Sequence, residues 1–192
     1  MSNRIETERE NGTLLVKFVR PEVRNPLSGG VLAELEAILA GLKNGRTIGK
    51  LIFTGTKNVF ASGADLNEIS KLTPDTAAVF GRRGQSLMDQ IATLPVLTIA
   101  AINGYCFGGA LDLALACQRR VSAPSATFCH PGAGLGIITG WGGTQRLPRL
   151  IGQARAMEMF FTASPISAER AYRIGLVDVI ATDAVADSKE LS

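Results

Sequence analysis

The chain has 192 residues, of which 46% are hydrophobic and 19% charged, a balance typical of a folded globular protein rather than a disordered one. The length suits one domain, and we predict a single domain over residues 1–192. The formal net charge is only +3, and Lys and Arg are scattered along the chain, so the composition argues against a nucleic-acid partner.

The compartment is predicted from three features of composition. The three cysteines form no CxxC pair and lie in apolar surroundings, as expected for buried free thiols in a reducing compartment. Residues 1–10 are charged and polar and carry no secretory signal. Residues 95–117 are apolar enough to resemble a membrane span, but Asn103, Asp112 and several glycines interrupt them. We therefore predict a soluble, cytoplasmic protein with no membrane partner.

The first part of the chain alternates strand and helix patterns. Asn11-Gly12 favours a tight hairpin turn between two strand-like runs. From Ser28, a good N-cap residue, leucine and isoleucine recur at helical spacing until Gly45, where we expect the helix to end. An irregular, glycine-bearing segment is expected at residues 57–66. The expected strands are residues 5–10, 13–19 and 50–54.

The second part repeats this alternation. Thr73-Pro74 opens a helix, with proline in the first turn, where its missing N–H costs nothing. Residues 96–102 are a continuous apolar run, as expected for a strand covered on both faces. Strands that alternate with helices predict an α/β fold with mainly parallel pairing. The other expected elements are helices at residues 109–117, 144–150, 153–162 and 168–174, strands at 119–122, 126–129 and 177–181, and a glycine-rich loop at 131–143.

A strand, a glycine turn and a helix follow one another twice, at residues 50–66 and 96–117. Glycine lets the backbone approach a ligand closely, and the first amides of a helix have no intrahelical partner. Two such turns that face each other would direct two N–H groups at one oxygen, which describes an oxyanion hole. The same glycines are also expected wherever a helix packs closely on a sheet, so the pattern alone leaves both interpretations open.

Four segments carry more specific motifs. Residues 60–66 read FASGADL, residues 100–110 read AAINGYCFGGA, and residues 142–147 read GGTQRL. Residues 166–177 contain ISAE followed by GLV. In this order and spacing, the segments resemble the signatures of the enoyl-CoA hydratase/isomerase (crotonase) superfamily, and the resemblance runs from residue 20 to about residue 181.

The resemblance implies an α/β fold of the ClpP/crotonase type, a spiral of ββα units, here with the usual C-terminal helical segment missing or shortened. It implies an acyl-CoA thioester substrate, coenzyme A as part of that substrate and no other cofactor, no metal, a role in fatty acid metabolism, and a homotrimer or hexamer. The family's two oxyanion amides correspond to Ala64 and Gly109. The positions implied to bind substrate and coenzyme A are Arg24, Ser62, Ala64, Asp65, Leu66, Asn67 and Gly109.

The acidic residues of the family are only partly present. Hydratases of this family use two glutamates, which correspond to Asp112 and Gly132, and some isomerases use a later acid, which corresponds to Gly140. Asp112 is one methylene shorter than glutamate, so its carboxylate is displaced by roughly 1.5 Å. A single base is sufficient for double-bond isomerisation, whereas hydration is easier with two groups. His130, the only histidine, is a candidate general acid or base, or a hydrogen-bonded structural residue.

Three functional hypotheses follow from these residues. The first is an enoyl-CoA hydratase/isomerase-type enzyme, a lyase or an isomerase, with Asp112 as base. The alternative is a non-catalytic acyl-CoA-binding paralogue, because Gly132 and Gly140 lack the family's carboxylates. A serine hydrolase is disfavoured, since there is no G-x-S-x-G motif.

Trp141, which stands where a smaller residue is common, is interpreted as shaping the acyl pocket or packing in the core.

Overall fold

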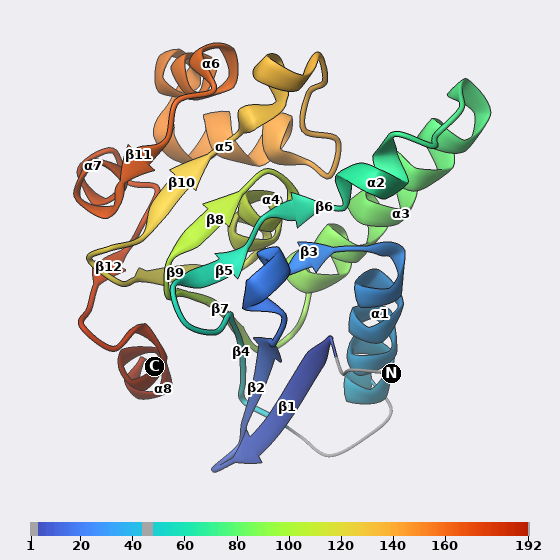
Figure 1. Ribbon diagram of the computed structural model, residues 1–192. Coiled ribbons are helices and arrows are strands. Elements are labelled where there is room, and N and C mark those ends of the chain that lie inside the picture. Colours follow the sequence, from blue (N-terminus) through green and yellow to red (C-terminus); the bar gives the residue numbers. More distant parts are fainter. Residues whose placement is uncertain (1–3, 44–47, 192) are drawn as a thin grey trace.

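We describe the protein from a computed structural model, which defines residues 4–43 and 48–191 (Figure 1). The helix end predicted at Gly45 lies outside the described residues.

The larger sheet has the strand order β1-β2-β4-β7-β9-β12. β1 and β2 form the predicted hairpin, with Asn11 and Gly12 both at positive φ, and the other neighbours pair in parallel. The strands are β1 (Ile5–Glu10), β2 (Thr13–Phe18), β4 (Lys50–Thr54), β7 (Leu97–Ile102), β9 (Arg119–Ser122) and β12 (Val179–Ile180).

A second sheet has the order β11-β10-β8-β5, and a short parallel pair joins β3 to β6. β4, β7 and β9 are each followed by a strand of the second sheet, namely β5, β8 and β10, so the chain passes repeatedly from one sheet to the other. The prediction that residues 57–66 are irregular is wrong, because β5 and β6 lie there. The strands are β3 (Pro26–Leu27), β5 (Val59–Ala61), β6 (Gly63–Ala64), β8 (Tyr105–Phe107), β10 (Thr127–Cys129) and β11 (Ile166–Ser167).

Helices cover both faces of the larger sheet. One face packs in the main hydrophobic core with α1, α3 and α4, and every residue from Ala110 to Ala116 of α4 is buried. The other face, which includes Ile52 and Ile99, packs against Ala184 of α8, on the side of the sheet opposite α1 (Figure 1). The helices are α1 (Gly29–Lys43), α2 (Leu66–Ile69), α3 (Pro74–Ala92), α4 (Gly109–Ala116), α5 (Gly143–Ile151), α6 (Gln153–Thr162), α7 (Ala168–Arg173) and α8 (Ala184–Glu190), with 3-10 turns at Pro21–Val23 and Pro131–Leu135.

The predicted α/β class and the parallel pairing are confirmed. The strand expected at residues 177–181 is shorter, and α8 was not expected from the sequence. α8 is a short, polar helix whose start is fixed by the Asp183 carboxylate, which accepts hydrogen bonds from the amides of Val185 and Ala186 at 3.0 Å. In the described part of the chain, no helix is both long and apolar enough to cross a membrane.

Candidate functional site

The two glycine turns meet at one point of the fold. Gly63 and Gly108 have φ of 91° and 54°, which side-chain-bearing residues rarely adopt. A Cβ on Gly63 would lie 2.6 Å from the Gly109 nitrogen, and a Cβ on Gly109 would lie 3.3 Å from the Ala64 nitrogen. The glycines are therefore required by close backbone approach. The same approach places the amides of Ala64 and Gly109 side by side, and Gly109, as the first residue of α4, has no intrahelical partner for its N–H.

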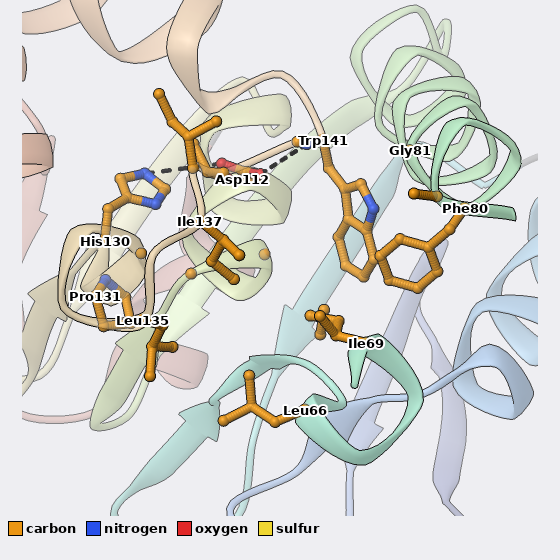
Figure 2. Close-up of a pocket in the computed structure, with 18 of the residues that line it drawn as sticks. Leu66, Ile69, Phe80, Gly81, Asp112, His130, Pro131, Leu135, Ile137 and Trp141 are labelled. Carbon is orange, nitrogen blue, oxygen red and sulfur yellow. Dashed lines mark hydrogen bonds and ion pairs between the residues drawn. The ribbon is translucent and has the colours of Figure 1, made fainter. Parts of the chain in front are cut away.

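These two residues line an apolar cavity of about 360 Å³ (Figure 2). Figure 2 shows Ile69, Phe80 and Trp141 on one side of it and Pro131 and Leu135 on the other. Asp112 and His130 are the ionisable side chains of its wall. The remaining lining residues are Ser62, Ala64, Leu66, Leu72, Ala77, Gly81, Gly108, Gly109, Gly132, Ile137, Ile138, Thr139 and Gly140.

Asp112 is held in a fixed orientation although it is completely buried. It lies in the first turn of α4, where the helix dipole favours an acid. Its Oδ2 accepts hydrogen bonds from the Thr139 hydroxyl and, at 3.2 Å, from the Trp141 amide. Burial raises the pKa of Asp112 from its ordinary 3.8 to about 6, although both hydrogen bonds oppose the increase. A carboxyl group with this pKa is ionised at neutral pH and can still accept a proton readily.

His130 lies beside this carboxylate. It follows β10, is 3% exposed, and its Nε2 lies 3.7 Å from Asp112 Oδ1 (Figure 2). Burial lowers the pKa of His130 to about 4, so the ring is neutral at physiological pH and the two groups do not form an ion pair. Among the described residues, the buried side-chain polar atoms without a hydrogen-bond partner are Asp112 Oδ1 and both ring nitrogens of His130.

Gly132 and Gly140, the positions at which the resemblance predicts acids, differ in the space around them. A Cβ on Gly132 would lie 2.5 Å from the Ile137 carbonyl oxygen, so a side chain there requires the loop to move. A Cβ on Gly140 would meet nothing within 4 Å. The loop therefore follows a path that excludes a side chain at residue 132 and leaves room for one at residue 140.

Trp141 fills the space between α3 and α4. Its ring would lie 2.1 Å from a Cβ on Gly84 and 2.6 Å from a Cβ on Gly109, and its centroid is 5.4 Å from that of Phe80. The indole therefore forms a wall of the cavity next to the Gly109 amide. The sequence offered packing and pocket shaping as alternatives for Trp141, and the structure shows both.

A second cavity, of about 560 Å³, continues from the first along the surface. Arg24, Ser62, Asp65, Leu66 and Asn67, all predicted to bind substrate or coenzyme A, line it together. Asp65 also has a structural role, since its carboxylate accepts a hydrogen bond of 2.8 Å from the Asn67 amide and caps α2. Sequence reasoning missed Arg20 and Tyr105, which line the same groove.

Buried Asn25 fixes the arginine side of this groove. Its side chain donates to the carbonyls of Val59 and Phe60 at 3.1 and 3.0 Å and so attaches this segment to β5. Arg24 next to it has φ of 63°, and its guanidinium carbon lies 5.5 Å from the centre of the Tyr105 ring. At this distance the Tyr105 ring attracts the guanidinium cation of Arg24. The contact holds the positive charge of Arg24 beside the groove.

The model of the enoyl-CoA hydratase/isomerase family matches residues 8–192. The chain belongs to this family. It is 35% identical to a short-chain-enoyl-CoA hydratase from Clostridium acetobutylicum, over 93% of this chain and 69% of the relative. It is 41% identical to the human mitochondrial enoyl-CoA hydratase domain-containing protein 2, over 94% of this chain and 61% of the relative. The chain thus spans about two thirds of the length of these curated relatives.

Solved structures agree with the family assignment. The crystal structure of an enoyl-CoA hydratase from Bacillus anthracis superposes with a TM-score of 0.90 and is 34% identical, covering 98% of this chain and 74% of that one. An enoyl-CoA hydratase from Thermoplasma volcanium gives a TM-score of 0.92 at 28% identity, covering 98% of this chain and 76% of that one. The predicted crotonase-like fold is therefore confirmed.

Proposed function

We propose that this chain is an acyl-CoA-processing enzyme of the enoyl-CoA hydratase/isomerase type that stabilises a thioester enolate between the amides of Ala64 and Gly109. The observation that carries the proposal is the meeting of two glycine turns at a cavity that also holds a buried carboxylate. Two backbone donors that face one oxygen match the charge that develops on a thioester carbonyl when it becomes an enolate. The groove beside Arg24 would take the coenzyme A part of the substrate.

Asp112 is the proposed proton-transfer group. In isomerisation of a 3-enoyl-CoA, its carboxylate removes a proton from C2, and the C–H electron pair moves into a dienolate whose negative oxygen lies between the two amides. The protonated Asp112 then returns the proton to C4, so the double bond moves and nothing is added or lost. Because its Oδ2 is fixed by Thr139 and Trp141, Oδ1 is the oxygen that can carry the proton.

A second candidate function is acyl-CoA binding without chemistry. Gly132 and Gly140 favour it, because both lack the carboxylates expected of the family's acids. In the experiment, crotonyl-CoA and a 3-enoyl-CoA are each added to the purified protein. Turnover and binding are then measured separately for each substrate. Turnover of either substrate supports the enzyme, whereas binding of both without turnover supports the binding protein.

Replacing Trp141 by alanine is expected to raise kcat/KM for long acyl chains relative to crotonyl-CoA by about tenfold or more, since each methylene accommodated in an apolar pocket contributes about 10–200-fold. The reason is that the indole closes the cavity against α3. The measurement is kcat/KM across a series of acyl-CoA chain lengths. Gly134→Ala, in the same loop and with nothing within 4 Å of the added Cβ, is the control. An unchanged chain-length profile would show that Trp141 does not limit the acyl chain.

The family resemblance also predicts a homotrimer or hexamer, and the composition predicts a cytoplasmic location. Ile138 and Phe161 are 68% and 73% exposed and would suit a subunit interface. One of the relatives is named as a mitochondrial protein. Both stay predictions.

A further inference from the structure

The motif GGTQRL at residues 142–147 has no role in the mechanism above, although it begins α5 next to the cavity. Its two glycines are required by close contacts. A Cβ on Gly143, the first residue of α5, would collide with Asp112 Oδ1. A Cβ on Gly142, which has φ of 107°, would collide with Nη1 of Arg146. The motif thus packs against the proposed base on one side and brings the Arg146 guanidinium back over its own start.

Arg146 joins the segment that ends at Trp141 to α3. Its Nη1 donates a hydrogen bond of 3.2 Å to the Trp141 carbonyl oxygen, and its Nη2 donates one of 2.5 Å to Oδ1 of Asp89 on α3. Gln85, one turn earlier on the same helix, donates a hydrogen bond of 2.8 Å to the Gly140 carbonyl oxygen. The carbonyls of two consecutive residues are therefore held from the side of α3.

The other side of the same segment holds the carboxylate of Asp112. The Trp141 amide donates a hydrogen bond of 3.2 Å to Asp112 Oδ2 (Figure 2). The Thr139 hydroxyl, two residues earlier, donates to the same oxygen. Trp141 is thus bound at both of its backbone polar groups, through its N–H to Asp112 and through its carbonyl to Arg146. A shift of this residue would loosen the orientation of the carboxylate.

Among the described residues, the ionisable groups that face Asp112 are His130, Cys106 and Arg146. Burial lowers the pKa of His130 to about 4, so its ring is neutral at physiological pH. Burial also raises the pKa of the Cys106 thiol, which therefore stays protonated. Burial raises the pKa of Asp112, and this rise is opposed by its hydrogen bonds and by the positive charge of Arg146. Arg146 therefore acts on the carboxyl group directly and through the segment that it holds.

We infer that Arg146 is a positioning residue of the reaction, because it holds the Trp141 backbone where the Trp141 amide fixes the Asp112 carboxylate. The inference rests on the proposed function, in which Asp112 transfers the proton. Asp89 is 71% exposed, and an ion pair of this kind contributes little to stability, so we assign it the role of orienting the guanidinium. Within the described part of the chain, the residues that line the two cavities do not include Arg146. It acts through Trp141 and not on the substrate itself.

For Arg146→Gln we expect kcat to fall by about 10–10²-fold, because a displacement of about 1 Å at a reacting group can cost 10²-fold. The loss of kcat/KM at acidic pH should begin about one pH unit higher than in the wild type, the effect of losing roughly one hydrogen bond to a charged group. Affinity for crotonyl-CoA should change little. The matched control is Arg149→Gln on the same helix, where the exposed side chain donates to the Gln145 carbonyl at 2.7 Å, and it should behave as the wild type.

Arg146→Lys separates position from charge. It keeps the positive charge, but one ammonium group replaces the two nitrogens that reach Trp141 and Asp89 separately. We expect its kcat to stay at least about fivefold below the wild type, with a smaller shift of the acidic limb than in Arg146→Gln. A lysine variant with wild-type kcat would show that only the charge matters and would overturn the positioning role.

Two further outcomes would overturn the inference while the proposed function stands: an Arg146→Gln variant with unchanged kcat, or one with a lower kcat and an unchanged pH profile. A wild type that turns over neither crotonyl-CoA nor a 3-enoyl-CoA overturns the proposed function instead. In that case, infrared difference spectra against Asp112→Asn follow the titration of the Asp112 carboxyl without turnover. The same upward shift in Arg146→Gln would then support control of this carboxyl by Arg146, and an unchanged titration would refute it.

Discussion

Replacing Asp112 by asparagine is expected to lower kcat for hydration and isomerisation by roughly 10²–10⁴-fold, while the affinity for acyl-CoA changes little. Asparagine keeps the shape and the acceptor for Thr139 and Trp141 but cannot take up a proton. In the wild type, kcat/KM should fall as the pH drops below about 6, where Asp112 becomes protonated. Steady-state kinetics between pH 5 and 9 check both effects. Full activity of Asp112→Asn would assign the base to another group, with His130 the nearest candidate.

The same substitution should also stabilise the protein at neutral pH. Asp112 has a pKa of about 6 in the folded protein against an ordinary 3.8, so the folded state holds the proton more tightly than the unfolded state. Stability contributed by this group is therefore present below about pH 4 and is lost as the pH rises to about 6. The difference between the two pKa values corresponds to roughly 2–3 kcal/mol in the free energy of unfolding. Asp112→Asn should gain that amount of unfolding free energy at pH 8 and little at pH 4, as measured by denaturant titration at both values. A variant less stable than the wild type at pH 8 would show that the buried carboxylate is not destabilising.

In the described part of the chain, every strand of four or more residues was predicted from the sequence, whereas of the shorter strands only β10 and β12 were. β4 and β7 have five and six residues, most of them apolar, and both were predicted. β5, β6 and β8 have only two or three residues each, which is too few to show alternation, so their segments were read as irregular or as a turn. These short strands form only because the neighbouring chain segments supply their hydrogen-bond partners.

The residues of the candidate site also fall into those that could be placed from the sequence and those that could not. Ala64, Gly109 and Asp112 lie within motifs or at fixed distances from them, so they could be placed from the sequence. The proximity of His130 to Asp112 could not, because it depends on how the residue after β10 folds against α4. The packing of Trp141 against Gly84 also joins residues 57 positions apart, and a glycine within a helix gives no sign of which side chain it accommodates.

Removing the N–H of Gly109 should lower kcat by about 10²–10³-fold, the usual effect of losing one oxyanion-hole donor. Proline suits the backbone at this position, since Gly109 is the first residue of α4 and its own N–H makes no intrahelical bond. A side chain at Gly109 nevertheless collides with Trp141, with the added Cβ only 2.6 Å from the ring. The substitution must therefore be made in a Trp141→Ala background.

The informative comparison is between Gly109→Pro and Gly109→Ala, each combined with Trp141→Ala. Both double variants add a Cβ in the same place and both lack the indole, but only the proline variant loses the amide donor. We expect the alanine variant to retain the activity of Trp141→Ala within about tenfold, and the proline variant to lose a further 10²–10³-fold in kcat. Acyl-CoA binding, measured in parallel by calorimetry, should be similar in the two, because the donor acts mainly on the enolate. Equal kcat in the two folded variants would mean that the Gly109 amide does not stabilise the reacting oxygen.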